Sequence, residues 1–313
     1  MKVVELTYPH QFKKIELDET VAAIGFFDGI HKGHQKLIDT AINKSKEQGR
    51  KSAVITFYPH PSVVLDREPK HVNYITPLKE KERLLRDMGV DILYVVTFNQ
   101  ELSKVSPEDF IDHFIIGLNV KHVIAGFDFS YGHKGNGSMD TILIHSKGEF
   151  NVTSIDKVKD DNGKISSTLI RKYLNEGKVD EANQLLVKSP FIRGVVIDGD
   201  KRGRSIGYPT ANLKLTEDFL LPKVGVYAVT IKHKEEQLLG MANVGYKPTF
   251  NEKATKPSIE VHIFDYNNNL YGEELLVEWK LYIRGEQKFN GIEELVGQIQ
   301  KDEQNIRAYL ETI

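Results

Sequence analysis

The chain has 313 residues, of which 40% are hydrophobic and 27% charged, a balance typical of globular proteins with about two domains. Its net charge of −2 argues against a nucleic-acid groove or a polybasic membrane patch, and the absence of cysteine excludes disulfides, thiolate catalysis and cysteine-ligated metals. The sequence contains no apolar run of membrane-spanning length and begins without the apolar core of a signal peptide. We therefore expect a cytoplasmic protein without nucleic-acid or membrane partners.

The first half of the chain alternates strand and helix patterns. Strand-like apolar runs lie at 21–27, 52–57, 92–98 and 120–125. Helices are predicted at 33–49, 77–89 and 107–117. Thr76 would be the N-cap of the second helix, with Pro77 as its first helical residue. This order predicts a parallel sheet with helices on both faces and with ligands at the carboxyl ends of the strands.

The segment 25–34, Gly-Phe-Phe-Asp-Gly-Ile-His-Lys-Gly-His, joins the first of these strands to the first helix. Free N–H groups and the helix dipole favour an anionic ligand at such a turn. His31 and His34 are three residues apart, so both rings can face one phosphate. Two polar histidines in a surface turn are the simpler alternative. The placement between strand and helix instead resembles the signature of adenylyl-transferring enzymes, in which histidines stabilise charge on the triphosphate as pyrophosphate leaves.

Further motifs follow the other strands of this half. Tyr58-Pro59-His60-Pro61 follows the second strand, and the segment 126–132 follows the strand at 120–125. A later segment, 164–171, contains Ser166 and Ser167, either of which would cap the next helix, and Arg171 about one turn inside it. Hydroxyls, free N–H groups and an arginine at one helix entrance form a phosphate site, although a plain Ser/Thr cap is the alternative.

The second half has a different pattern. Strand-like runs lie at 191–197, 225–231, 238–244, 258–264 and 275–283. Many short strands without intervening helices indicate an antiparallel sheet, most economically closed as a barrel. A final amphipathic helix is expected from Ile292 to Leu310, with Leu295, Ile299 and Ile306 among its core contacts. We place the boundary near 187, which gives domains at 1–187 and 188–313.

The segment 199–212 is the other stretch that indicates chemistry. Its glycines would allow a ligand to approach the backbone closely, and its basic side chains are Lys201, Arg202 and Arg204. Thr210 and Asn212 offer oxygen ligands two residues apart, on one side of an extended segment. Such donors suit a Mg²⁺ ion that also holds phosphates. A glycine-rich loop with solvated basic residues is the alternative.

Glu260 lies within the apolar run 258–264, where alternation places it on one face with His262 and Phe264. A carboxylate there is either solvated or directed into a pocket. A kinase needs a base that takes the proton from the attacking hydroxyl, and Glu260 is the candidate. An exposed strand glutamate is the alternative.

Over essentially its whole length, the chain resembles the bacterial bifunctional riboflavin kinase/FAD synthetase family. The resemblance rests on the order of motifs at 25–34, 57–61, 126–132, 165–171, 209–212, 243–250, 260 and 284–289. It implies an N-terminal Rossmann-like nucleotidyltransferase domain with a parallel sheet and a C-terminal antiparallel β-barrel with a terminal helix. The barrel would phosphorylate riboflavin to FMN, and the N-terminal domain would adenylylate FMN to FAD with release of pyrophosphate.

The resemblance also assigns residues. His31, His34 and Glu260 would be catalytic, and Thr210 and Asn212 would hold Mg²⁺. In the first domain, ATP would be bound by Gly25, Phe27, Asp28, Gly33, Asp128, Ser166, Ser167, Thr168 and Arg171. In the barrel, the nucleotide would be bound by Gly199, Lys201, Gly203, Arg204 and Gly207. The flavin would contact Pro61, Asp128, Arg284, Glu286 and Phe289.

Two positions depart from the family pattern: Phe26 stands where asparagine or tyrosine is usual, and Lys164 where some members carry arginine. Neither change removes a residue with an assigned role. Two alternatives remain, an enzyme with only one live activity and a flavin-binding regulatory protein without turnover. A different adenylyltransferase is disfavoured because such enzymes lack the barrel. We expect ATP, riboflavin and FMN as small-molecule partners of a monomer or weak homo-oligomer.

Overall fold

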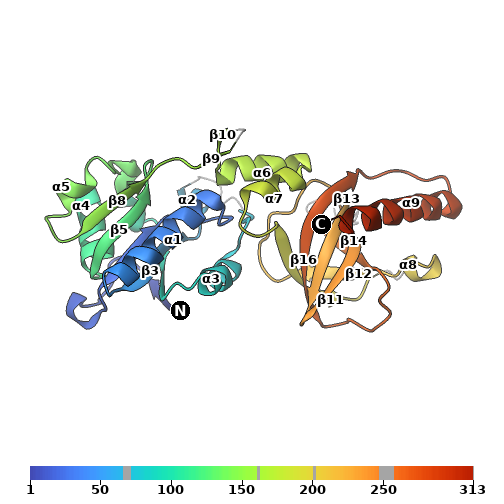
Figure 1. Cartoon of the computed structure of the whole chain (residues 1–313), viewed down its shortest axis with the longest axis horizontal. Helices are drawn as coiled ribbons and strands as arrows, with labels where there is room; N and C mark the ends of the chain where they lie inside the picture. Colours follow the sequence, from blue (N-terminus) through green and yellow to red (C-terminus); the bar gives the residue numbers. More distant parts are fainter. Residues whose placement is uncertain (66–71, 161–162, 200–201, 247–256, 313) are drawn as a thin grey trace. The chain divides into compact units, whose positions relative to one another are not determined.

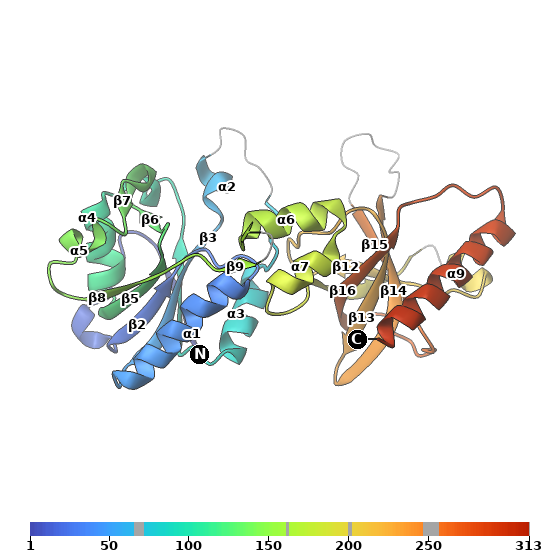
Figure 2. The ribbon, with the colours of Figure 1, turned by 45° about the horizontal axis from the view of Figure 1, so that its top comes forward.

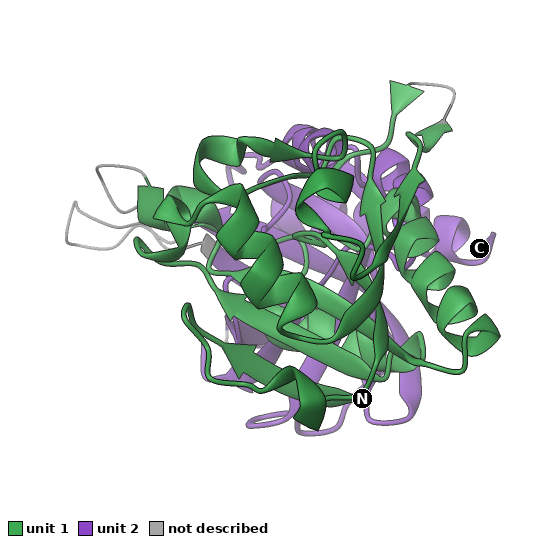
Figure 3. Cartoon of the chain, turned by 90° about the vertical axis from the view of Figure 1, so that its left-hand side faces the viewer, with its two compact units in different colours: residues 1–166 green, residues 167–313 purple. Residues whose placement is uncertain are grey.

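The computed structural model describes residues 1–65, 72–160, 163–199, 202–246 and 257–312. The chain divides into two compact units, Met1–Ser166 and Ser167–Ile313 (Figure 3). Two helices, α6 (Ser167–Glu176) and α7 (Val179–Leu185), belong to the second unit. The predicted domain boundary near 187 falls between α7 and the first barrel strand.

The first unit is built on a six-stranded sheet in the order β1-β4-β3-β2-β5-β8, and all its strand pairs are parallel (Figure 1). The strands are β1 (Lys2–Leu6), β2 (Thr20–Ile24), β3 (Lys51–Tyr58), β4 (Ile92–Thr97), β5 (Val120–Gly126) and β8 (Asn151–Ile155). The parallel sheet predicted from the sequence is therefore confirmed. The strand order reverses at β2, with β3 on one side and β5 on the other. In such sheets a crevice for ligands opens at this switch point, beyond the carboxyl ends of the strands.

Helices cover both faces of this sheet (Figure 2). The covering helices are α1 (Lys32–Glu47), α3 (Leu78–Asp87), α4 (Pro107–Ile111) with a following π-helical turn (Asp112–Ile116), and α5 (Ile142–His145). A short helix, α2 (Pro61–Leu65), has no buried residue. Helices α1 and α3 bury Ile38 and Leu85 on one face, and α4 buries Phe110 on the other. Every residue of β2 is buried, as expected for a central strand covered on both faces.

The predicted start of α3 is wrong by one residue. The helix begins at Leu78, and Pro77 rather than Thr76 occupies the cap position. The backbone N–H of Thr76 donates to the Asp28 carboxylate at 3.0 Å. A tertiary partner thus binds the N–H that precedes the helix, and local sequence preference could not reveal it.

The second unit contains a closed antiparallel barrel in the order β11-β12-β15-β14-β13-β16. Its strands are β11 (Phe191–Ile197), β12 (Ala211–Leu215), β13 (Gly225–His233), β14 (Glu236–Tyr246), β15 (Pro257–Ile263) and β16 (Glu274–Arg284). The predicted barrel is confirmed, and β12 is a strand that the sequence pattern did not indicate. The terminal helix α9 (Ile292–Leu310) has the predicted bounds and buries Ile306 and Leu310 against the barrel.

The remaining short elements lie near the ends of the longer ones. They include the strand pairs β6 (Ser130–Tyr131) with β7 (Gly137–Ser138) and β9 (Lys159–Asp160) with β10 (Gly163–Lys164), the helix α8 (Arg202–Ser205), and 3₁₀ turns at Lys14–Glu16, Leu102–Lys104 and His133–Gly135. Within the ranges given above, we find no helix that is both long and apolar enough to cross a membrane.

Candidate active sites

The turn between β2 and α1 is held in an unusual backbone conformation. Phe27 and Ile30 have φ values of 51° and 41°, a left-handed region that bulky residues rarely adopt. A Cβ atom at Gly25 would lie 3.2 Å from the Phe27 ring, so this ring packs directly against the backbone of Gly25. Such strain persists only where the surrounding structure imposes it, and it concentrates at functional sites.

His31 and His34 lie together at the entrance of α1. His31 is the N-cap residue, and its Nδ1 accepts a hydrogen bond from the His34 backbone N–H at 3.2 Å. The two rings stack with centroids 3.6 Å apart. Because Nδ1 is an acceptor, the neutral His31 ring carries its proton on Nε2, which is then a hydrogen-bond donor.

Burial determines the charge of these rings. His31 is 6% exposed, and burial lowers its pKa to about 4. Burial also lowers the pKa of His34 well below its usual value, and the nearby His31 and Lys81 act in the same direction. Both rings are therefore neutral at physiological pH and can meet phosphate oxygens as hydrogen-bond donors rather than as cations.

A residue that the sequence analysis missed, Lys81 on α3, lies against the same turn. Its ammonium donates to the Phe26 carbonyl at 2.6 Å and to Thr56 Oγ1 at 3.2 Å. Burial lowers its pKa to about 8, an effect that the charge of Asp28 opposes. A signal was available, because Lys81 follows Leu78 by three residues and precedes Leu85 by four, on the apolar face of the helix.

Other predicted motifs meet at this edge of the sheet. The His60 ring lies 5.0 Å from the Phe26 ring. Asp128, just beyond β5, forms an exposed ion pair with Lys164. The ammonium groups of Lys164 and Lys157 lie 5.2 and 4.6 Å from the centre of the Phe127 ring.

The remaining residues predicted for the first site lie on three segments. A Cβ atom at Gly33 would lie only 3.1 Å from the His31 ring. Pro61 is the first residue of α2. Ser166 ends the first unit, and Ser167, Thr168 and Arg171 lie in the first turns of α6.

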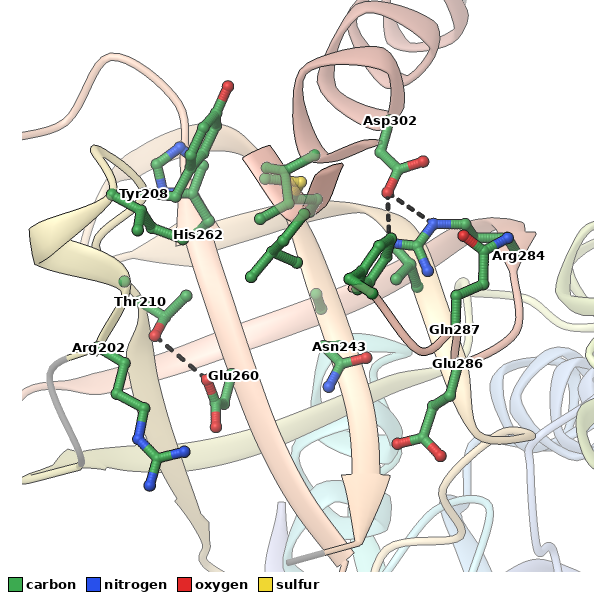
Figure 4. Close-up of a pocket in the computed structure, with 18 of the residues that line it drawn as sticks. Arg202, Tyr208, Thr210, Asn243, Glu260, His262, Arg284, Glu286, Gln287 and Asp302 are labelled. Carbon is green, nitrogen blue, oxygen red and sulfur yellow. Dashed lines mark hydrogen bonds and ion pairs between the residues drawn. The ribbon is translucent and has the colours of Figure 1, made fainter. Parts of the chain in front are cut away.

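The second unit contains a cavity of about 620 Å³, between the barrel and α9 (Figure 4). This volume is in the range of small-molecule sites. The predicted residues that line it are Gly203, Thr210, Glu260, Arg284, Glu286 and Phe289. Arg204 lines a smaller cavity of about 90 Å³ that shares Thr210. Gly199, Gly207 and Asn212 line neither cavity, and Lys201 lies outside the described residues.

Glu260 points into the larger cavity from β15 (Figure 4). Its strand neighbours are Asn212 on β12 and Asn243 on β14. Thr210 Oγ1 donates to the Glu260 carboxylate at 3.3 Å. The strand pairing thus places a carboxylate between two amides, beside a hydroxyl.

These groups fit a Mg²⁺ ion in kind. Thr210, Asn212 and Glu260 offer hydroxyl, amide and carboxylate oxygens, the donors that this ion prefers. A Cβ atom at Gly199 would lie 2.1 Å from Asn212 Nδ2, so the amide packs in a space that only glycine leaves open. The described part of the chain has no cluster of three or more His, Cys, Asp or Glu residues that could hold a metal.

A buried ion pair closes another side of the cavity. Arg284 donates from Nε to the Asp302 carboxylate on α9 at 2.8 Å, and Gln298 donates to the other oxygen at 2.8 Å. The Arg284 guanidinium lies 5.8 Å from the centre of the Phe289 ring. Asp302 was not predicted, although it follows Ile299 by three residues and precedes Ile306 by four, on the apolar face of α9.

Two family models match the two halves of the chain. The model described as FAD synthetase matches residues 13–169, and the model described as riboflavin kinase matches residues 186–310. A bifunctional riboflavin kinase/FMN adenylyltransferase of Bacillus subtilis is 47% identical over 314 residues, covering 100% of this chain and 99% of that protein. The chain belongs to the bifunctional riboflavin kinase/FMN adenylyltransferase family.

More distant members of this family also match over nearly the full length. The Escherichia coli K12 protein of the same description is 33% identical over 307 residues, covering 96% of each chain. A crystal structure described as a macrolide-efflux protein from Streptococcus pneumoniae has a TM-score of 0.88 and 34% identity. That likeness covers 98% of this chain and 99% of the other, so the two proteins share the same fold over nearly their full length.

Proposed function

We propose that the barrel transfers the γ-phosphoryl group of ATP to riboflavin, giving FMN and ADP. The first unit then transfers AMP from a second ATP to FMN, giving FAD and pyrophosphate. The observation that carries this proposal is that each of the two halves matched by a family model has its own candidate catalytic side chains. In the first unit these are neutral histidines at the switch point of the sheet, and in the barrel a carboxylate inside a cavity.

In the barrel, Glu260 is the general base. Its carboxylate takes the proton from the 5′-hydroxyl of riboflavin while that oxygen attacks the γ-phosphorus and ADP leaves. Arg284, Glu286 and Phe289 bind the flavin, and Gly199, Lys201, Gly203, Arg204 and Gly207 bind the nucleotide.

Thr210 and Asn212 hold Mg²⁺, which when bound neutralises charge on the phosphates of ATP. The packing of Asn212 on the backbone of Gly199 supports this assignment. A Gly199→Ala substitution would displace the amide, so the Mg²⁺ concentration for half-maximal kinase activity should rise severalfold. FMN adenylyltransferase activity in the same protein should not change.

In the first unit, a phosphate oxygen of FMN attacks the α-phosphorus of ATP, and pyrophosphate leaves. His31 and His34 donate hydrogen bonds to the phosphate oxygens on which charge develops. The backbone around Gly25, Phe27, Asp28 and Gly33 binds the nucleotide. The strained backbone of this turn supports that role, because strain concentrates at functional sites. From the family resemblance we carry over a phosphate-binding role for Ser166, Ser167, Thr168 and Arg171, a contact of Asp128 with adenine or flavin, and a contact of Pro61 with flavin.

The test is an incubation with riboflavin, ATP and Mg²⁺, followed by chromatography of the products. His31→Ala should abolish FAD formation and leave FMN formation intact, whereas Glu260→Gln should abolish FMN formation and leave conversion of supplied FMN to FAD intact. Loss of both activities in either folded variant would refute the two-site assignment. Tight FMN binding without pyrophosphate release would instead indicate a flavin-binding protein without turnover.

The same proposal includes the setting of the enzyme. Because both reactions consume ATP, we place the protein in the cytoplasm, and we propose that it acts as a monomer or weak homo-oligomer. We propose that the adenylyltransferase domain spans residues 1–187, and so includes α6 and α7 of the second unit, and that the kinase domain spans 188–313. Partners other than ATP and the flavins are not required by this chemistry.

A further inference from the structure

A charged ammonium group lies beneath the strained turn of the first unit. Lys81 is 3% exposed, and its Nζ contacts the Phe26 carbonyl and Thr56 Oγ1 at 2.6 and 3.2 Å. The Thr56 hydroxyl donates to the same carbonyl at 3.0 Å. Phe26 is therefore held by two side chains, one from α3 and one from β3. Burial of an ammonium is costly, so its retention here calls for a role.

Helix α3 and the residues just before it form hydrogen bonds to the turn at two points. The backbone N–H of Thr76, two residues before the helix, donates to the Asp28 carboxylate at 3.0 Å, and Lys81 within the helix donates to the Phe26 carbonyl. Between these anchored residues lies Phe27, whose φ of 51° is unfavourable for a side chain of its size. The two contacts hold this residue in a conformation that it would otherwise leave.

The charge of Lys81 acts electrostatically on the histidine pair. The titratable groups that act on it or respond to it are Asp28 in the turn and His34 on α1. Among the described residues, its hydrogen-bond partner from β3 is the uncharged Thr56 hydroxyl. Among the described contacts, both hydrogen bonds of the ammonium go to oxygen atoms inside the protein.

We propose that Lys81 is a positioning residue for adenylyl transfer, which fixes the Phe26–Asp28 turn so that His31 and His34 meet the phosphates of ATP in a single arrangement. It acts through the turn and does not touch the substrate. This inference rests on the adenylyltransferase function proposed for the first unit. Nothing in it concerns the kinase, whose residues lie in the second unit.

The test compares Lys81→Met with Lys79→Met, which changes an exposed lysine on the same helix. Both activities are measured on the same full-length chain. Lys81→Met should lower kcat/KM for FAD formation at least tenfold while riboflavin kinase stays within twofold of the wild type. Lys79→Met should alter neither. A wild-type protein without FAD formation would refute the proposed function, whereas a fully active Lys81→Met variant would refute only this inference.

A pH profile separates positioning from simple loss of stability. Because the charge of Lys81 lowers the pKa of His34, its removal should shift the acid limb of kcat for FAD formation to higher pH. An unchanged acid limb in a folded Lys81→Met variant would overturn the inference.

A second variant covers the case in which Lys81→Met does not fold. Thr56→Val removes one support of the Phe26 carbonyl and keeps the ammonium in place. It should reduce kcat/KM for FAD formation several-fold without changing its melting temperature by more than a few degrees. Wild-type FAD formation by Thr56→Val would then count against the inference.

Discussion

The burial of a neutral histidine at the start of α1 should make the first unit sensitive to acid. The folded-state pKa of His31 is about 4, whereas the ordinary value is 6.5. As pH falls below 6.5, the unfolded chain binds a proton that the folded protein does not bind until about pH 4. The stability contributed by the buried neutral ring is therefore complete above pH 6.5 and is lost as pH falls toward 4.

The magnitude follows from the two pKa values. One pKa unit corresponds to about 1.4 kcal/mol, so lowering the pH from about 7 to about 5 should cost the first unit about 2 kcal/mol through His31 alone. That corresponds to an increase of about 30-fold in the equilibrium constant for opening, and so to a loss of about 30-fold in the protection of its amides from exchange. His34 adds to the loss in the same direction, because burial also lowers its pKa.

Hydrogen–deuterium exchange of peptides from β2 and α1, corrected for intrinsic rates, measures this effect at the two pH values. His31→Asn keeps an acceptor that is well suited to an N-cap and removes the titrating ring. Between the two pH values, this variant should lose about 30-fold less amide protection than the wild type, which is the share calculated for His31. His262→Asn, in the second unit, serves as the control and should leave first-unit exchange unchanged. If His31→Asn lost protection as steeply as the wild type, the burial argument would fail.

Two further predictions concern the two sites. Gly33→Ala should stabilise α1, because alanine is favoured over glycine in helices by about 1 kcal/mol. Its Cβ would nevertheless displace the His31 ring. Steady-state assays should therefore show kcat/KM for FAD formation lowered about tenfold. Asp302→Asn should leave the Arg284 guanidinium buried without a counter-charge and destabilise the second unit by about 3 kcal/mol. Urea unfolding followed by the fluorescence of Trp279, the single tryptophan, measures this loss.

Local signals were sufficient for much of the architecture. The strand-to-helix turn at 25–34, the start of α4 at Pro107 and the bounds of α9 agree with the sequence expectations. Each depends on hydrogen bonds or apolar spacing within a few consecutive residues. Such interactions are encoded in the order of neighbouring side chains, so periodicity and capping preferences predict them.

Tertiary structure decided the features in which distant segments supply the partner. The N–H of Thr76, just before α3, is bound by Asp28, which is 48 residues away. Lys81 has the spacing of a residue on the apolar face of its helix, but its partner, the Phe26 carbonyl, is 55 residues away in the turn before α1. Likewise, Glu260 lies between two asparagines only because β12 and β14 pair with β15 in one register. Contacts of this kind depend on chain closure over long separations, for which a single sequence carries no local signal.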